Sequence, residues 1–163
     1  MANLVEKPSD ILPNKDRSPK WPTNIVGSIS HTSSEAIAVV ASPHHHSALG
    51  VDIENWIELD VAQEIYSTIL NDGEIELARC STMDFHRVLT LVFSAKESLY
   101  KALFPSVRKY FGFECASVVS VNLSTGECTL MLEKSLSAEL HKGKSFVVRF
   151  WAQKHHVVSL LVI

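Results

Sequence analysis

Two short segments carry acidic and basic side chains at spacings that could support chemistry. Residues 50–54, Gly-Val-Asp-Ile-Glu, alternate apolar and acidic types, so a β-strand would present Asp52 and Glu54 on one face, roughly 6–7 Å apart. Glu97 and Lys101 lie four residues apart, which puts both side chains on one face of a helix. Three carboxylates beside a lysine form a hard-oxygen site that suits Mg²⁺, and the lysine can neutralise a phosphate.

Each segment taken alone has an ordinary structural explanation. Asp52 and Glu54 could form a solvated strand face, and Glu97 and Lys101 could be a surface ion pair worth about 0.2–0.5 kcal/mol. A functional interpretation is favoured by three motifs that follow one another along the chain. They are residues 27–32, Gly-Ser-Ile-Ser-His-Thr, residues 50–54, and residues 93–101, Phe-Ser-Ala-Lys-Glu-Ser-Leu-Tyr-Lys.

In this order and spacing the three motifs resemble those of the 4′-phosphopantetheinyl transferases. The resemblance is to the surfactin-synthetase-activating type, in its enterobactin synthase branch, and it runs from about Arg17 to the C-terminus. It implies an α+β fold, the 4′-phosphopantetheinyl transferase fold, in which two α/β lobes form a pseudo-dimer. Coenzyme A would bind in the cleft between the lobes.

The resemblance also implies a domain organisation. Family members carry a longer segment before the position of Arg17, including basic residues that hold the nucleotide, so we expect the first lobe to be incomplete. Four of the six prolines fall within the first 24 residues, which favours an extended arm over 1–24. Residues 25–48 would be the remainder of the N-terminal lobe, and residues 49–163 the C-terminal lobe.

The family's site residues map onto this sequence one by one. The resemblance places Asp52, Glu54 and Glu97 at the Mg²⁺ ion. Glu97 would also be the base that deprotonates the attacking serine, directly or through a water. Lys101 would contact the phosphate that carries the developing charge, which makes Glu97 and Lys101 the catalytic pair.

Further residues are expected at coenzyme A. The resemblance places His31 on a coenzyme A phosphate, with Ser30 as a hydroxyl donor. Arg17 belongs to an Arg-x-Pro-x-Trp-Pro stretch that resembles a family segment near the nucleotide. Lys96 points to a different side of the helix from Lys101, and we expect it to contact the nucleotide or the carrier protein.

The expected function is Mg²⁺-dependent transfer of the 4′-phosphopantetheine group from coenzyme A to a serine of an acyl or peptidyl carrier protein, in siderophore or other secondary-metabolite biosynthesis. Two alternatives stay open. A chain without its N-terminal portion could bind a carrier protein or a nucleotide without turnover. The same carboxylates could also serve a Mg²⁺-dependent hydrolase that cleaves the pyrophosphate of coenzyme A.

Composition limits the partners and the compartment. The chain has 163 residues and a net charge of −3, which gives no bulk electrostatic reason to expect a nucleic acid partner. It contains no apolar run of the roughly 18 residues that span a bilayer, and its polar first ten residues are unlike a secretory signal. Three widely spaced cysteines are typical of reduced thiols, so we expect a cytoplasmic protein.

The hydrophobic pattern predicts the elements that must position these residues. Strands are expected over 25–30, 35–41, 49–54, 114–122, 127–133, 146–153 and 157–162. Helices are expected over 61–70 with Asp60 as N-cap, over 73–80, from 81 or 84 to 104, where Pro105 should end the helix, and over 135–141. On the long helix, we expect an apolar stripe at 88, 92, 95, 99 and 103 to be buried, and a polar line of Thr90, Ser94, Glu97 and Lys101 to face a ligand.

Overall fold

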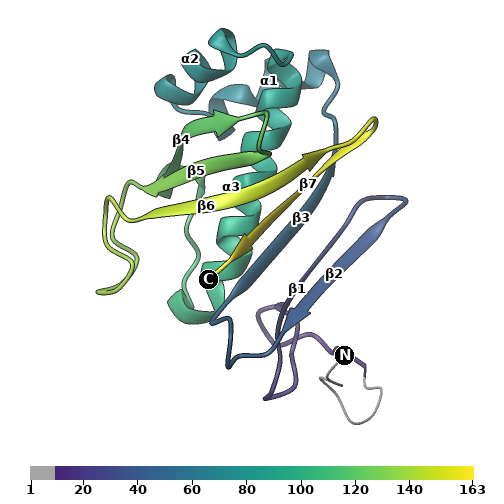
Figure 1. The fold of residues 1–163 in the computed structure, drawn as a ribbon, viewed down its shortest axis with the longest axis vertical. Helices are drawn as coiled ribbons and strands as arrows, with labels where there is room; N and C mark the ends of the chain where they lie inside the picture. The colour runs from purple at the N-terminus through teal and green to yellow at the C-terminus, as the bar shows by residue number, and fades with distance from the viewer. Residues whose placement is uncertain (1–9) are drawn as a thin grey trace.

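A twisted five-stranded antiparallel sheet with one long helix across it dominates the computed structural model, which describes residues 10–163 (Figure 1). The strand order is β3-β7-β6-β5-β4. The strands are β3 (Leu49–Asn55), β4 (Ala116–Asn122), β5 (Glu127–Leu132), β6 (Ser145–Ala152) and β7 (His156–Val162). Strands β3 and β4, far apart in the sequence, therefore form the two edges of the sheet.

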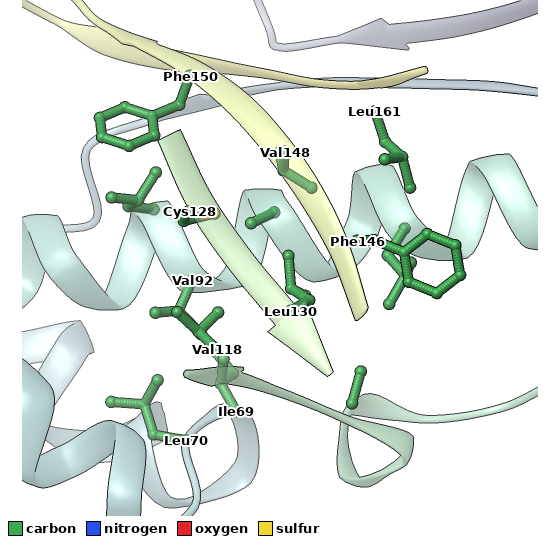
Figure 2. Close-up of a cluster of buried hydrophobic side chains, with 14 of the residues drawn as sticks. Ile69, Leu70, Val92, Val118, Cys128, Leu130, Phe146, Val148, Phe150 and Leu161 are labelled. Atoms are coloured by element: carbon green, nitrogen blue, oxygen red, sulfur yellow. The ribbon is translucent and has the colours of Figure 1, made fainter. Parts of the chain in front are cut away.

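The long helix α3 (Phe85–Val107) covers one face of this sheet. Its predicted apolar stripe at residues 88, 92, 95, 99 and 103 is buried throughout. Alternate residues of the sheet meet it, among them Leu130, Val148 and Leu161 (Figure 2). The shorter helices α1 (Leu59–Ile69) and α2 (Asp72–Cys80) lie at the β4 end of the sheet. This mixed architecture confirms the expected α+β class.

Small residues let α3 approach the edge strand β3 closely. A Cβ added at Gly50 would lie 1.8 Å from the carbonyl oxygen of Ser98 on α3, so no side chain fits there. Beside this contact, Ser94 and Ser98 of α3 share hydrogen bonds with Ser159 of β7, with Oγ–Oγ distances of 2.8 and 2.7 Å. The glycine of the 50–54 motif is therefore a packing residue that brings the next strand positions up to α3.

A two-stranded antiparallel hairpin, β1 (Val26–His31) and β2 (Ala36–Ala41), lies beside β3 (Figure 1). Within the described residues, the hairpin forms a sheet of its own rather than extending the five-stranded one. The Oγ atom of Ser28 on β1 accepts a hydrogen bond from the amide of Val51 on β3, at 3.0 Å. The side chain of Ser28 thus takes the place of a backbone carbonyl of a neighbouring strand as the acceptor for this amide at the edge of the sheet.

Residues 10–25 form a loop ahead of this hairpin. An antiparallel bridge between Pro13 and Pro19 closes it, and Arg17 at its tip has the left-handed φ of 67°. The amide of Arg17 donates to the carbonyl of Asn14 at 3.0 Å. Most of the arm predicted over 1–24 thus has little regular structure, and residues 1–9 of that prediction lie outside the described part of the chain.

Three local predictions were wrong. Helix α3 continues through Pro105 to Val107, although proline has no N–H for a helical bond; beyond it the amide of Arg108 donates to the carbonyl of Phe104 at 2.9 Å, and the Oγ of Ser106 donates to that of Leu103 at 2.8 Å. Residues 135–141 are not helical; the hydroxyls of Ser135 and Ser137 bind backbone amides and compete with helical bonds. The N-cap of α1 is Glu58, not Asp60.

Two remaining observations concern the whole described chain. No helix of residues 10–163 is both long enough and apolar enough to cross a membrane. All three cysteines are free thiols; Cys115 and Cys128 are buried, and Cys80 is exposed.

Candidate functional site

Three elements meet at Asp52, which is almost fully buried at 1% exposure. Every second residue of β3, at positions 50, 52 and 54, lies on the sheet face that α3 covers. From α3, the Nζ atom of Lys101 forms an ion pair with Oδ1 of Asp52 at 2.6 Å. From β1, the hydroxyl of Ser30 donates to the same oxygen at 2.8 Å and accepts from Lys101 Nζ at 2.9 Å. Each residue comes from a different predicted motif.

The second oxygen of Asp52 stands out in this cluster. Among the described residues, Oδ2 is the buried side-chain polar atom that has no hydrogen-bond partner. Leaving a buried carboxylate oxygen unpaired costs free energy in an ordinary core. Such an atom next to a lysine and two further carboxylates is typical of a ligand position.

Glu54 and Glu97 supply those two carboxylates, and both are half-buried. Burial raises the pKa of Glu54 from 4.5 to about 7, and the negative charge of Asp52 adds to this rise. Burial likewise raises the pKa of Glu97, again reinforced by Asp52, while Lys101 opposes the shift. The three predicted carboxylates thus lie close enough to act on one another electrostatically, and each lies beside the charge of Lys101.

His31 ends β1 at the open side of this cluster and is exposed. Its positive charge, when present, lowers the pKa of Glu54, so the ring lies within electrostatic reach of that carboxylate. The ring itself makes a long contact of 3.3 Å from Nδ1 to the carbonyl oxygen of Thr32. His31 is therefore available to an incoming group.

A groove of about 550 Å³ runs from Lys101 along the end of α3, between β1 and the loop of residues 14–21. Four basic side chains line it, together with Asp16 and the ring of Trp21. The basic residues are Arg17, Lys20, Lys101 and Arg108. A groove with this lining suits a polyanionic ligand with a flat ring system. Arg17 was predicted here; Lys20 and Arg108 were not, and nothing in their sequence context marks them.

A smaller cavity of about 240 Å³ lies on the other side of Glu97. It is lined by Glu97 and Tyr100 from α3 and by residues 110–113, which include Tyr110 and Phe111. The ring centroids of Tyr100 and Phe111 are 4.9 Å apart. Glu97 thus stands between an aromatic cavity and the carboxylate cluster.

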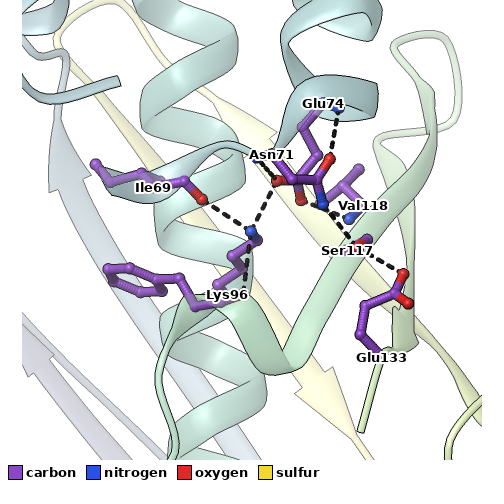
Figure 3. A network of polar contacts seen from close by, with 8 residues as sticks. Ile69, Asn71, Glu74, Lys96, Ser117, Val118 and Glu133 are labelled. Carbon is purple, nitrogen blue, oxygen red and sulfur yellow. Dashed lines mark hydrogen bonds and ion pairs between the residues drawn. The ribbon is translucent and has the colours of Figure 1, made fainter. Parts of the chain in front are cut away.

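The ammonium of Lys96 does not reach the carboxylate cluster, although its side chain is part of the lining of the smaller cavity. This corrects the prediction that Lys96 contacts the nucleotide or the carrier. Its side chain is 3% exposed, and its Nζ atom pairs with Glu74 Oε2 at 2.8 Å (Figure 3). Two backbone carbonyls, of Ile69 at 2.9 Å and Phe113 at 3.3 Å, accept from the same ammonium. Its three donors are therefore used within the protein.

Only two of the four residues in the predicted polar line on α3 reach the site. Glu97 and Lys101 reach the site, as expected from their spacing. Thr90 and Ser94 are fully buried: the Oγ1 atom of Thr90 accepts from the amide of Ile57 at 3.1 Å. The first two members of the line therefore serve packing, because α3 lies flat on the sheet over this stretch.

The donor set fits a hard divalent cation, although it is not a ready-made cage. Within residues 10–163, no three acidic, histidine or cysteine side chains are already arranged as a metal-binding group. The observation in favour is the orphaned Oδ2 atom of Asp52, a residue whose charge acts on both Glu54 and Glu97. Carboxylate oxygens are the protein ligands that Mg²⁺ prefers.

Comparison with known proteins decides the family. Residues 48–159 match the model of the 4′-phosphopantetheinyl transferase superfamily, and residues 1–41 match that of the 4′-phosphopantetheinyl transferase N-terminal domain. The chain belongs to the 4′-phosphopantetheinyl transferase superfamily. This confirms the resemblance inferred from the three motifs.

Individual relatives agree with this assignment. Enterobactin synthase component D of Salmonella typhimurium is 34% identical over 146 residues, which cover 90% of this chain and 58% of the relative. The protein of that name in Escherichia coli K12 is 38% identical over 107 residues, covering 65% of this chain and 48% of the relative. The 4′-phosphopantetheinyl transferase PptT of Mycobacterium tuberculosis is 30% identical over 127 residues, covering 77% and 55%. The chain therefore spans about half the length of these relatives.

The two matched regions meet at the carboxylate cluster of this superfamily member. Asp52, Glu97 and Lys101 lie in the region that matches the superfamily model, whereas Ser30 and His31 lie in the region that matches the N-terminal domain. The hydrogen bonds of Ser30 to Asp52 and Lys101 cross that junction. The cluster is thus built by both regions together.

Proposed function

We propose that this chain transfers the 4′-phosphopantetheine group of coenzyme A to a serine hydroxyl of a carrier protein, in a Mg²⁺-dependent reaction. The observation that carries the proposal is the buried Asp52, held by Lys101 and Ser30, which has one unpartnered oxygen and whose charge acts on both Glu54 and Glu97. Membership of the superfamily supports the same chemistry.

Asp52, Glu54 and Glu97 would hold the Mg²⁺ ion. When bound, the ion neutralises charge on the pyrophosphate of coenzyme A. Burial, reinforced by the charge of Asp52, raises the pKa of Glu54 and of Glu97. A divalent cation beside them would favour the charged form of both carboxylates.

Glu97 would act as the general base. The serine oxygen of the carrier attacks the phosphorus next to pantetheine, the bond from that phosphorus to the leaving phosphate oxygen breaks, and adenosine 3′,5′-bisphosphate departs. Glu97 accepts the serine proton, directly or through a water. Its raised pKa brings this carboxylate nearer to neutral pH, where a base is most effective.

Positive side chains would hold the phosphates. Lys101, which is partly exposed towards the groove, would bind the phosphate on which charge develops, and His31 would bind a neighbouring phosphate with help from Ser30. Arg17, in the same groove, would contact the nucleotide. This leaves the aromatic cavity beside Glu97 for an uncharged part of the reactants.

We further propose carrier proteins of siderophore or other secondary-metabolite synthesis as the acceptors, because several relatives are named enterobactin synthase component D. Acyl and peptidyl carriers both present a serine that the proposed chemistry can modify. The cytoplasm is the compartment we propose, in keeping with three free cysteines.

A direct assay tests the proposal. The purified chain, coenzyme A and Mg²⁺ are incubated with an apo peptidyl carrier domain of a siderophore synthetase or an apo acyl carrier protein, and the carrier is weighed by mass spectrometry. We expect the carrier to gain one phosphopantetheine group, and to gain none with Glu97→Gln or with chelator present.

The other outcomes identify the alternatives. Coenzyme A cleavage without any carrier would indicate a pyrophosphate hydrolase, and the cleavage would persist when the carrier serine is replaced by alanine. Saturable binding of coenzyme A or carrier with no product would indicate a binding module. Either result would contradict the transferase proposal for this chain.

A further inference from the structure

A second lysine–carboxylate pair lies one helical turn from the site and takes no part in the chemistry proposed above. Lys96 and Glu74 are both almost fully buried, at 4% and 0% exposure. Their Nζ–Oε2 distance is 2.8 Å. Burying two charges is costly unless every remaining donor and acceptor is also paired, so the surroundings of the pair decide what it does.

The ammonium of Lys96 connects three segments that are distant in the sequence. It donates to the carbonyl of Ile69 at the end of α1, to Glu74 in α2, and to the carbonyl of Phe113 in the 3₁₀ turn η1 (Phe113–Cys115) (Figure 3). A neutral side chain of the same length could not make these three bonds. Lys96 therefore ties α3 to all three segments through one atom.

Glu74 is equally well satisfied and adds the sheet edge to the assembly. Its Oε1 atom accepts from the amide of Val118 on β4 at 2.7 Å, and its Oε2 atom accepts from the amide of Asn71 at 2.9 Å. Asn71 in turn accepts from the amide of Glu74, completing a capping box at the start of α2. The Nδ2 atom of Asn71 donates to Ser117, whose hydroxyl donates to Glu133.

This network reaches the functional site through the chain neighbours of its members. Lys96 directly precedes Glu97 on α3. Phe113, whose carbonyl Lys96 holds, belongs to the wall of residues 110–113 that encloses the aromatic cavity beside Glu97. The rings of Phe93 and Phe113 also meet edge-on, with centroids 5.5 Å apart. The wall of residues 110–113 is therefore anchored at the ammonium of Lys96, next to Glu97 on α3.

We propose that Lys96 is a positioning residue: through Glu74 and the Phe113 carbonyl it fixes residues 110–113 relative to Glu97, and so sets the width of the cavity in which the reactants meet Glu97. The proposal rests on the proposed function for its effect on turnover. Its structural part, the anchoring of residues 110–113, stands independently of that function.

A double variant separates positioning from simple stability. Lys96→Met leaves the buried carboxylate of Glu74 without a counter-charge, whereas Lys96→Met combined with Glu74→Gln removes both charges and retains an acceptor for the amide of Val118. We therefore expect the double variant to unfold at a higher urea concentration than Lys96→Met alone. It still cannot donate to the carbonyls of Ile69 and Phe113.

Three measurements follow on the double variant. Amide exchange of residues 110–116 should accelerate about tenfold or more while exchange in β6 and β7 stays unchanged. The kcat for phosphopantetheine transfer should fall about tenfold or more, while the Kd for coenzyme A changes less than about threefold. Lys134→Met is the matched control, because Lys134 pairs with Glu114 next to the same turn but on the surface; it should change none of the three.

Several results would overturn the inference. Wild-type exchange of residues 110–116 in the double variant would show that the ammonium does not anchor them. Wild-type kcat with accelerated exchange would show that the anchoring does not matter to Glu97. If the wild-type chain transfers nothing, the proposed function fails, and the exchange measurement still decides whether Lys96 holds this wall.

Discussion

Helix α3 carries two lysines that each pair with a buried carboxylate, and the two pairs differ in the exposure of the lysine and in how many hydrogen bonds the carboxylate accepts. Lys96 pairs with Glu74 and Lys101 pairs with Asp52, at 2.8 and 2.6 Å. In the first pair the lysine is 3% exposed and both carboxylate oxygens accept further hydrogen bonds. In the second the lysine is 26% exposed, and one carboxylate oxygen has no partner.

The comparison shows how a structural ion pair can be told from a functional one. Where every donor and acceptor is used within the protein, as at Lys96 and Glu74, a ligand has nothing left to bind. Where a buried oxygen stays unpaired and the cation can turn towards a groove, as at Asp52 and Lys101, a ligand completes the set. The same residue types five positions apart therefore have opposite roles.

The largest expected effect concerns stability. Lys96→Met should lower the free energy of unfolding by about 3–5 kcal/mol, because it leaves the fully buried carboxylate of Glu74 without its counter-charge, with only two backbone amides still donating to it. Lys101→Met leaves Asp52 with only the hydroxyl of Ser30 as a donor, but this lysine is 26% exposed, so its ammonium is less desolvated and the loss should be smaller, about 1–2 kcal/mol. Urea unfolding at neutral pH measures both. Equal losses would remove the distinction between the two pairs.

For activity, in contrast to stability, we expect the substitution of Lys101 to have the larger effect of the two. Lys101→Met should lower the rate of phosphopantetheine transfer by about 10²-fold, because it removes a positive charge that acts on the developing phosphate charge. Lys101→Arg should restore part of the rate, since it keeps the charge but presents it in a planar group. Single-turnover kinetics with saturating coenzyme A make the comparison. An unchanged rate in Lys101→Met would show that this pair, like Lys96 and Glu74, is only structural.

The smallest expected effect is a pH dependence of the free energy of unfolding that arises from Glu54, in the cluster around Asp52. The pKa of Glu54 is raised from 4.5 to about 7 by burial and by Asp52, so the folded state binds its proton more tightly than the unfolded state does. The stabilising contribution is complete below pH 4.5 and is lost as pH rises to about 7, with a total of roughly 1 kcal/mol after allowance for solvent screening.

Glu54→Gln isolates this contribution. Without divalent cations, the stability of the wild type minus that of Glu54→Gln should fall between pH 5 and pH 7 in urea unfolding experiments, and stay level above. A difference that rises over this range would mean that the positive charges of Lys101 and His31, rather than burial and Asp52, dominate around Glu54.

Much of the fold followed from local pattern. The strand bounds were predicted within two residues, because alternation of apolar residues and short turns mark antiparallel strands. The predicted end of α3 at residue 104 was wrong, because the turn around Pro105 is closed by a hydrogen bond from the amide of Arg108 to the carbonyl of Phe104. The predicted helix over 135–141 was wrong because two serines bind the backbone themselves.

At the site, spacing predicted which side chains share an element, but not what each meets across the fold. The two-residue period of a strand predicted that Asp52 and Glu54 share a face, and the four-residue spacing on a helix predicted the same for Glu97 and Lys101. Lys96 was assigned to a ligand because its partner, Glu74, lies 22 residues away in another helix. The Asn71-x-x-Glu74 spacing signals the capping box of α2, but not the ion pair that its glutamate also makes.

The tight contact at Gly27 gives the molecule an intrinsic reporter. A Cβ at Gly27 would lie 2.7 Å from the ring of Trp21, so the indole rests directly on the strand backbone while it lines the basic groove. The other two tryptophans lie elsewhere: Trp56 donates to the carbonyl of Gln153, and Trp151 is exposed on β6. Replacing those two with phenylalanine would leave a chain whose fluorescence registers occupancy of the groove without any label.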